Sequence, residues 1–227
     1  MLLLIPGMMC DARMWGKLAG LPPVLHADIT GASTGADSVQ ALATAILQTA
    51  PDSFDLAGLS MGGIVAMEVL RQAPQRVRRL ALLDTNPRAE LPEVQALRAP
   101  QIARAFAGDL AGVMADMIPR YFAQHQETLA NLCLDMALDL GPQTFARQSR
   151  ALRDRPDQTA TLATFKGPTL VLMGAHDQLC PRDRHDQMHA AMPQSRLTII
   201  PDAGHIPPLE NPQATQTALR NWLDQPC

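Results

Sequence analysis

Five residues around Ser60 have the types and spacing of a nucleophilic turn. They read GLSMG at residues 58–62, which is a G-x-S-x-G motif. An apolar run precedes the motif and a helical pattern follows it, and this strand-turn-helix context separates such a motif from a chance match. Glycines on either side permit a turn tight enough to project the hydroxyl from the edge of a sheet. The motif therefore predicts Ser60 as the nucleophile of an acyl-transfer reaction.

A serine is a weak nucleophile and needs a base that is oriented by an acid. After such a motif the acid comes next in the chain, and the histidine follows it. His205 meets this order and lies in a loop after the last apolar run, so we predict it as the base. The other histidines are weaker candidates, because they precede the serine, lie in helical stretches or adjoin a candidate acid: His26, His125, His176, His185 and His189.

Two aspartates are candidates for the acid. Asp84 and Asp177 both follow apolar runs that predict strands, and α/β proteins place their sites at that edge of the sheet. One strand-helix-strand unit separates Asp177 from His205, so their loops are expected to be neighbours. We therefore predict Asp177 as the acid and keep Asp84 as the alternative.

Backbone amides are expected to hold the negative charge that forms on the substrate oxygen. Such an oxyanion hole uses the amide after the nucleophile and a second one from an early loop. These positions predict Met61 and Met8 as donors, with Gly7 allowing the loop to aim the second amide inward. A pair of histidines four residues apart, His185 and His189, resembles a metal pair but lacks the glutamate of a zinc motif, so we expect no metal and no cofactor.

The elements that must position these residues alternate between strands and helices, as in a parallel sheet. Apolar runs predict strands at residues 2–5, 24–29, 54–59, 77–83, 169–173 and 196–200. Helical patterns cover residues 38–49, 62–72, 181–192 and 212–223, the first with Asp37 or Ser38 as its N-cap. Residues 87–165 show helical periodicity without a convincing strand. This segment is too long for an ordinary connection between two strands.

Composition sets further bounds on function. The chain has 227 residues, of which 47% are hydrophobic and 18% charged, with a net charge of −3. The absence of a basic stripe disfavours a nucleic-acid partner. No apolar run approaches a membrane span, and the first residues lack the basic start of a secretion signal, so we expect a cytoplasmic protein without a membrane partner. Four scattered cysteines are expected to be free thiols: Cys10, Cys133, Cys180 and Cys227.

Four segments make the chain similar to the α/β-hydrolase superfamily over nearly its whole length. They read LLLIPGMMCDARMW, LAGLSMGGIVAMEVLRQAPQRVRRLALLDT, PTLVLMGAHDQLCP and IPDAGHIPPLENP. The chain looks most like small bacterial carboxylesterases, a group that includes methyl ester esterases. The resemblance implies an α/β fold in which residues 1–86 and 166–227 form the core and residues 87–165 a helical cap. It also implies a mostly parallel sheet of about six strands without the usual N-terminal hairpin.

The expected function is hydrolysis of a small-molecule carboxylic ester through a Ser-His-Asp triad and an acyl-enzyme. The same triad could cleave an amide, as in an aminopeptidase, a carbon–carbon bond or a thioester. A non-catalytic ligand-binding protein of the same fold is a further alternative. The sequence does not identify the substrate or the oligomeric state.

Overall fold

Six parallel strands form one sheet at the centre of the molecule. The computed structural model describes residues 1–16 and 21–226. In this part of the chain the strand order is β2-β1-β3-β4-β5-β6, and all five pairings are parallel. The strands are β1 (Leu2–Ile5), β2 (Val24–His26), β3 (Phe54–Leu59), β4 (Val77–Leu83), β5 (Thr169–Gly174) and β6 (Arg196–Ile200). Every residue of β1, β3 and β5 is buried, as expected of strands covered on both faces.

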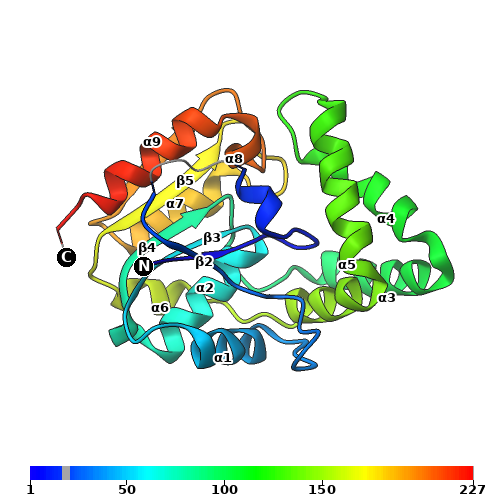
Figure 1. The fold of residues 1–227 in the computed structure, drawn as a ribbon, viewed down its shortest axis with the longest axis horizontal. Helices are drawn as coiled ribbons and strands as arrows, with labels where there is room; N and C mark the ends of the chain where they lie inside the picture. The colour runs from blue at the N-terminus through cyan, green and yellow to red at the C-terminus, as the bar shows by residue number, and fades with distance from the viewer. Residues whose placement is uncertain (17–20, 227) are drawn as a thin grey trace.

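Helices cover both faces of this sheet. In Figure 1, α1, α2 and α6 lie on one face and α9 on the other. The helices within the core are α1 (Val39–Thr49), α2 (Met61–Gln72), α7 (Arg182–Ala191), α8 (Pro207–Glu210) and α9 (Pro212–Leu223), with short helical turns η1 (Ala12–Trp15) and η2 (Pro74–Arg76). The side chain of Ser38 accepts a hydrogen bond from the amide of Ala41 and is therefore the N-cap of α1.

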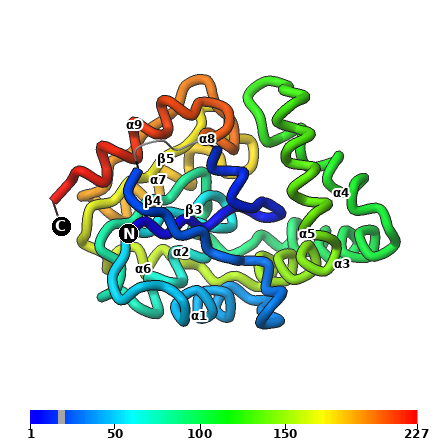
Figure 2. The backbone as a smooth tube through the Cα atoms, viewed as in Figure 1, coloured from blue at the N-terminus to red at the C-terminus, as the bar shows by residue number. Residues whose placement is uncertain are grey.

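The segment between β4 and β5 is helical throughout its regular structure. It contains α3 (Pro92–Arg104), η3 (Ala105–Asp109), α4 (Leu110–Met117), η4 (Ile118–Arg120), α5 (Glu127–Arg153) and α6 (Thr159–Thr164). Helix α5 is broken at Gly141, which has φ 75° and ψ 173° and precedes Pro142. Helices α3, α4 and α5 gather at one end of the molecule, away from both termini (Figure 2).

The fold class expected from the sequence is confirmed, and the predicted helices agree with the observed ones to within one residue at each end. The strand predicted at residues 24–29 is shorter, because β2 ends at His26. Beyond it, a hydrogen bond from the amide of Ala27 to the carbonyl of Leu4 continues the pairing by one residue. Among the described residues, no helix is long and apolar enough to cross a membrane.

Candidate active site

Ser60 occupies the sharp turn between β3 and α2. Its backbone has φ 55° and ψ −119°, a left-handed conformation that is uncommon for a residue other than glycine. The carbonyl of Ser60 accepts hydrogen bonds from the Thr85 hydroxyl at 2.6 Å and from the Gly63 amide at 2.9 Å. These contacts hold the strained turn in place, and the N-terminus of α2 then points at the serine.

The glycines at 58 and 62 are required by the packing of this turn. A Cβ on Gly58 would lie 2.2 Å from the carbonyl oxygen of Gly62. A Cβ on Gly62 would lie 2.0 Å from the carbonyl oxygen of Ile5 at the end of β1. Both distances are far below van der Waals contact, so a larger residue at 58 would push away the first turn of α2, and one at 62 would push away the end of β1.

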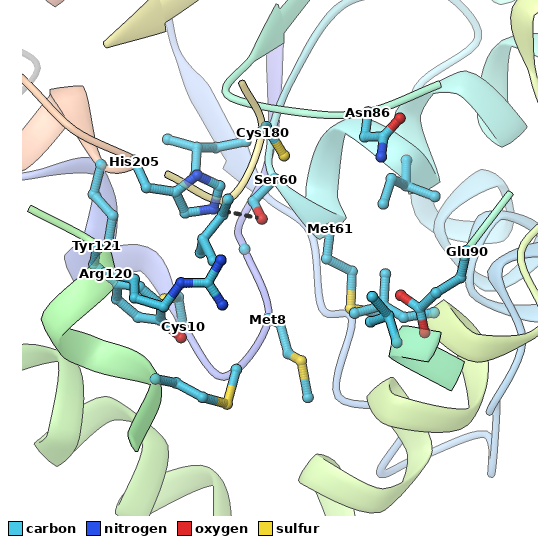
Figure 3. Close-up of a pocket in the computed structure, with 18 of the residues that line it drawn as sticks. Met8, Cys10, Ser60, Met61, Asn86, Glu90, Arg120, Tyr121, Cys180 and His205 are labelled. Carbon is cyan, nitrogen blue, oxygen red and sulfur yellow. Dashed lines mark hydrogen bonds between the residues drawn. The ribbon is translucent and has the colours of Figure 1, made fainter. Parts of the chain in front are cut away.

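The structure brings Ser60, His205 and Asp177 into one hydrogen-bonded chain. His205 Nε2 lies 2.8 Å from Ser60 Oγ, a contact drawn in Figure 3. Nδ1 of the same ring lies 2.9 and 3.0 Å from the two carboxylate oxygens of Asp177. His205 is buried, and its ring packs against Tyr121 with 6.0 Å between the ring centroids. This is the geometry in which an imidazole can take the proton of a serine hydroxyl while a carboxylate orients it.

The carboxylate of Asp177 is kept ionised by its surroundings. Burial alone would raise its pKa, but the His205 ring and the amides of Cys180 and Leu179 hold the pKa below its ordinary value. These two amides donate to Oδ1 at 3.1 and 2.8 Å. A charged Asp177 can therefore stabilise the positive charge that His205 gains when it accepts a proton.

Asp84, the alternative acid, bonds to the backbone at the end of β5 and not to the His205 ring in the described chain. Its Oδ1 accepts a hydrogen bond from the Gly174 amide at 2.8 Å, and within the described chain no hydrogen bond joins it to His205. Burial and then the negative charge of Asp177 raise the pKa of Asp84 well above its ordinary value, which favours its protonated form. The geometry thus favours Asp177 over Asp84 as the partner of the histidine.

The loop after β1 brings the backbone amide of Met8, one of the two expected oxyanion donors, toward the serine. A Cβ on Gly7 would lie 3.5 Å from the Cβ of Ser60, so the loop runs directly beside the nucleophile. The amides on either side of Met8 have acceptors, since Gly7 donates to the Met14 sulfur at 3.3 Å and Met9 to the Gln148 side chain at 2.8 Å. In the described part of the chain the Met8 amide donates to no protein acceptor.

Met61 offers the other amide. It is the first residue of α2, where the helix itself supplies no acceptor for an amide. Within residues 1–16 and 21–226, neither of the two amides expected to form an oxyanion hole donates to a protein acceptor. One comes from the loop after β1 and the other from the first residue of α2.

Two positioning residues were not found by sequence reasoning. Gln148 on α5 is fully buried; its amide oxygen binds the Met9 amide, and its nitrogen donates to the Ile29 carbonyl at 3.1 Å. Glu210 accepts hydrogen bonds from the amides of Gly204 and Ala123, both at 2.8 Å, and so joins the histidine loop to the segment before α5. The only hint of Glu210 in the sequence is its place shortly after His205.

A cavity of about 260 Å³ opens beside Ser60, and Figure 3 shows the side chains around it. Methionines from the core and from the segment between β4 and β5 contribute to its wall: Met8, Met14, Met61 and Met117. Three further methionines are buried in the hydrophobic core without lining this cavity: Met9, Met114 and Met136. The cavity therefore has a largely apolar, adaptable wall around a polar centre.

The thiols of the described cysteines and the side chains of the histidine pair are not part of this hydrogen-bonded chain. Cys10, Cys133 and Cys180 are free and buried, and Cys227 lies outside the described residues. On α7, His185 is fully buried. The neighbouring His189 does not share a site with it, because its Nδ1 bonds to the Ser195 hydroxyl at 2.7 Å.

Comparison with known proteins shows which family the chain belongs to. The pimeloyl-[acyl-carrier protein] methyl ester esterase of Aromatoleum aromaticum is 28% identical over 193 residues, which cover 78% of this chain and 76% of that protein. A thermophilic esterase from Thermogutta terrifontis, solved with malate bound, has a TM-score of 0.85 at 29% identity, covering 98% of this chain and 88% of that chain. A hydrolase from Pseudomonas aeruginosa PA01 has a TM-score of 0.87 at 26% identity, covering 99% and 90%. A model of the alpha/beta hydrolase family matches residues 2–217, so the chain belongs to this family and is a hydrolase.

Proposed function

We propose that this hydrolase cleaves a small-molecule carboxylic ester, with Ser60 as nucleophile, His205 as base and Asp177 as acid. The observation that carries the proposal is the continuous hydrogen-bonded chain from Ser60 Oγ through the His205 ring to Asp177. The similar proteins that are named as esterases support an ester as the substrate.

The first half of the reaction forms an acyl-enzyme. Ser60 Oγ attacks the ester carbonyl carbon while its proton moves to His205 Nε2. The carbonyl oxygen becomes negative and is held by the amides of Met61 and Met8. The bond from carbon to the alcohol oxygen then breaks, and His205 gives its proton to the leaving alcohol.

The second half restores the enzyme. A water molecule gives a proton to His205 Nε2 while the water oxygen attacks the acyl carbon. The bond from that carbon to Ser60 Oγ breaks, the serine takes back its proton, and the carboxylic acid leaves. Each half moves one proton onto the histidine and one off it, so these steps need no cofactor.

The segment from residue 87 to 165 is proposed to act as a cap over a core made of residues 1–86 and 166–227. Residues of this segment support this role by lining the cavity at Ser60, among them Met117, Arg120 and Tyr121. Gln148, in the same segment, supports the loop of Met8. The cap would therefore both select the substrate and hold the oxyanion loop.

Steady-state kinetics of wild-type protein and Ser60→Ala tests the proposal. The wild type should hydrolyse p-nitrophenyl acetate, and the variant should lose at least about 10³-fold in kcat. A parallel panel of aminoacyl p-nitroanilides and acyl thioesters compares the other bonds that a serine triad can cleave. Full activity in Ser60→Ala, or faster cleavage of the anilides, would overturn the proposed ester chemistry.

A further inference from the structure

Two buried arginines share one carboxylate in the wall of the cavity. Arg98 donates to both oxygens of Glu90, at 2.9 and 2.8 Å, and Arg155 donates to the second of these oxygens at 2.5 Å. The side chains are only 10%, 9% and 3% exposed for Arg98, Arg155 and Glu90. In the described ranges 1–16 and 21–226, no other carboxylate pairs with either arginine. One negative charge thus balances one of two guanidinium groups, and the cluster carries a net positive charge.

The excess charge faces the substrate cavity. All three side chains line the same cavity as Ser60. The remaining terminal nitrogen of Arg98, Nη1, faces the sulfur of Met8 at 3.8 Å. A thioether is a weak acceptor, so this strong donor has no partner of matching strength on the protein. Burying a guanidinium without a full counter-charge is unfavourable, and a bound anion would supply the missing charge.

The cluster lies across Ser60 from His205. In Figure 3, His205 and Arg120 lie on one side of Ser60, while Met61 and Glu90 lie on the other. The leaving alcohol takes its proton from His205 and so departs on the histidine side. An acyl part that extends away from the histidine can then reach Glu90 and its two arginines.

We propose that Arg98 and Arg155 form a subsite for an anionic group at the far end of the acyl chain. A carboxylate or a phosphate has the planar or multiple oxygens that an arginine pair binds best. The inference rests on the proposed ester hydrolysis and adds a substrate class to it, namely esters whose acyl part ends in an anion.

A purely structural role for the cluster makes a different prediction. Glu90 lies in the segment after β4, Arg98 on α3 and Arg155 just after α5, so the ion pairs also fasten these segments together. If fastening were their only role, the charge of the substrate would not matter. Substrate charge is therefore the variable to test.

Two matched substrates make this test. Mono-p-nitrophenyl glutarate ends in a carboxylate, and p-nitrophenyl pentanoate ends in a methyl group on an acyl chain of equal length. We expect kcat/KM to be about 10-fold or more higher for the glutarate, mainly through a lower KM. In Arg98→Gln this preference should fall to within about twofold.

The matched control is Arg104→Gln. Arg104 is an exposed arginine on the same helix, paired with Asp109 and Asp116 and absent from the cavity wall, and its loss removes the same charge. This variant should keep the preference for the glutarate ester. If both variants lost the preference for the glutarate ester equally, the overall charge of the protein would explain it, and the subsite would be overturned.

Binding of unreactive anions separates the subsite from the catalytic proposal and from any folding defect of Arg98→Gln. Calorimetric titration of wild-type protein and of Ser60→Ala with glutarate, butyl phosphate and neutral pentanamide needs no turnover. The subsite predicts that at least one anion binds about 10-fold or more tighter than the amide, and the better one identifies carboxylate or phosphate as the ligand chemistry. If both anions bind no better than pentanamide, the subsite is overturned even where ester hydrolysis is observed. If an anion binds but no ester is cleaved, the proposed function fails and the anion site stands.

Discussion

Replacing Gln148 with methionine should destabilise the protein and slow its chemistry at the same time. The side chain is fully buried between the loop after β1 and the loop after β2, where it binds the Met9 amide and the Ile29 carbonyl. Methionine has a similar volume but offers neither an amide oxygen nor a donor. The change would therefore leave two buried backbone groups without hydrogen bonds.

Each unsatisfied group costs about 1–3 kcal/mol, so the free energy of unfolding should fall by about 2–6 kcal/mol. That is a large share of the roughly 5–15 kcal/mol that stabilises an ordinary domain. The amide of Met8 is adjacent to the lost contact, and loss of one oxyanion donor costs about 10²–10³ in kcat. Because Gln148 fixes the loop without touching the substrate, we expect part of this loss, about 10- to 100-fold in kcat, with little change in KM.

Urea unfolding and steady-state hydrolysis of p-nitrophenyl acetate measure both effects. Gln143→Met is the control, since Gln143 is exposed on the same helix and undergoes the same substitution. It should match the wild type in stability and rate. The reasoning is refuted if Gln148→Met keeps a kcat within twofold of wild type, or if the control loses as much as the buried variant.

The remaining predictions concern the turn, the thiols and acid stability. Gly62→Ala should prevent correct folding, because its Cβ would lie 2.0 Å from a carbonyl oxygen. In the control Gly35→Ala the Cβ meets no atom within 4 Å, so the change should cost only about 1 kcal/mol for the positive φ. Soluble yield and thermal melting compare the two variants. Burial raises the pKa of Cys10 and of Cys180, so these two thiols should resist iodoacetamide at pH 8 in native protein. Peptide mass spectrometry checks this, and rapid modification of either thiol would contradict it. The pKa of Asp177 is lowered on folding, because the effect of its hydrogen-bonded partners outweighs that of its burial. The ionised carboxylate therefore stabilises the fold above its unfolded pKa of about 4, and this stability is lost as the pH falls through the folded pKa. Unfolding free energies below about pH 4 should therefore decline less steeply in Asp177→Asn.

The sequence predicted the parts of the site that depend on short-range pattern. Ser60 lies at a strand-to-helix junction because the alternation from apolar run to helical pattern is visible in the sequence, and the flanking glycines mark the tight turn. Asp177 and His205 follow from the order of strands in a parallel sheet, since strand ends on one edge bring their loops together. The roles of these residues stay predictions, while the geometry that places them in contact is now described.

What the sequence could not predict depends on contacts between distant segments. Gln148 reaches Met9 across 139 residues, and nothing in the local pattern of α5 distinguishes it from Gln143. Arg98 and Arg155 belong to a segment whose positive and negative charges nearly balance, so only the fold shows that they share one buried carboxylate. The choice between Asp84 and Asp177 likewise required the position of the imidazole.

Labelling with a fluorophosphonate tests the central claim most directly. This reagent phosphonylates a serine only where a base activates it and an oxyanion hole accepts the new charge. Peptide mass spectrometry should find one adduct, on Ser60, which disappears in His205→Ala. A protein that hydrolyses p-nitrophenyl acetate but carries no adduct at Ser60, or carries it on another residue, would contradict the account.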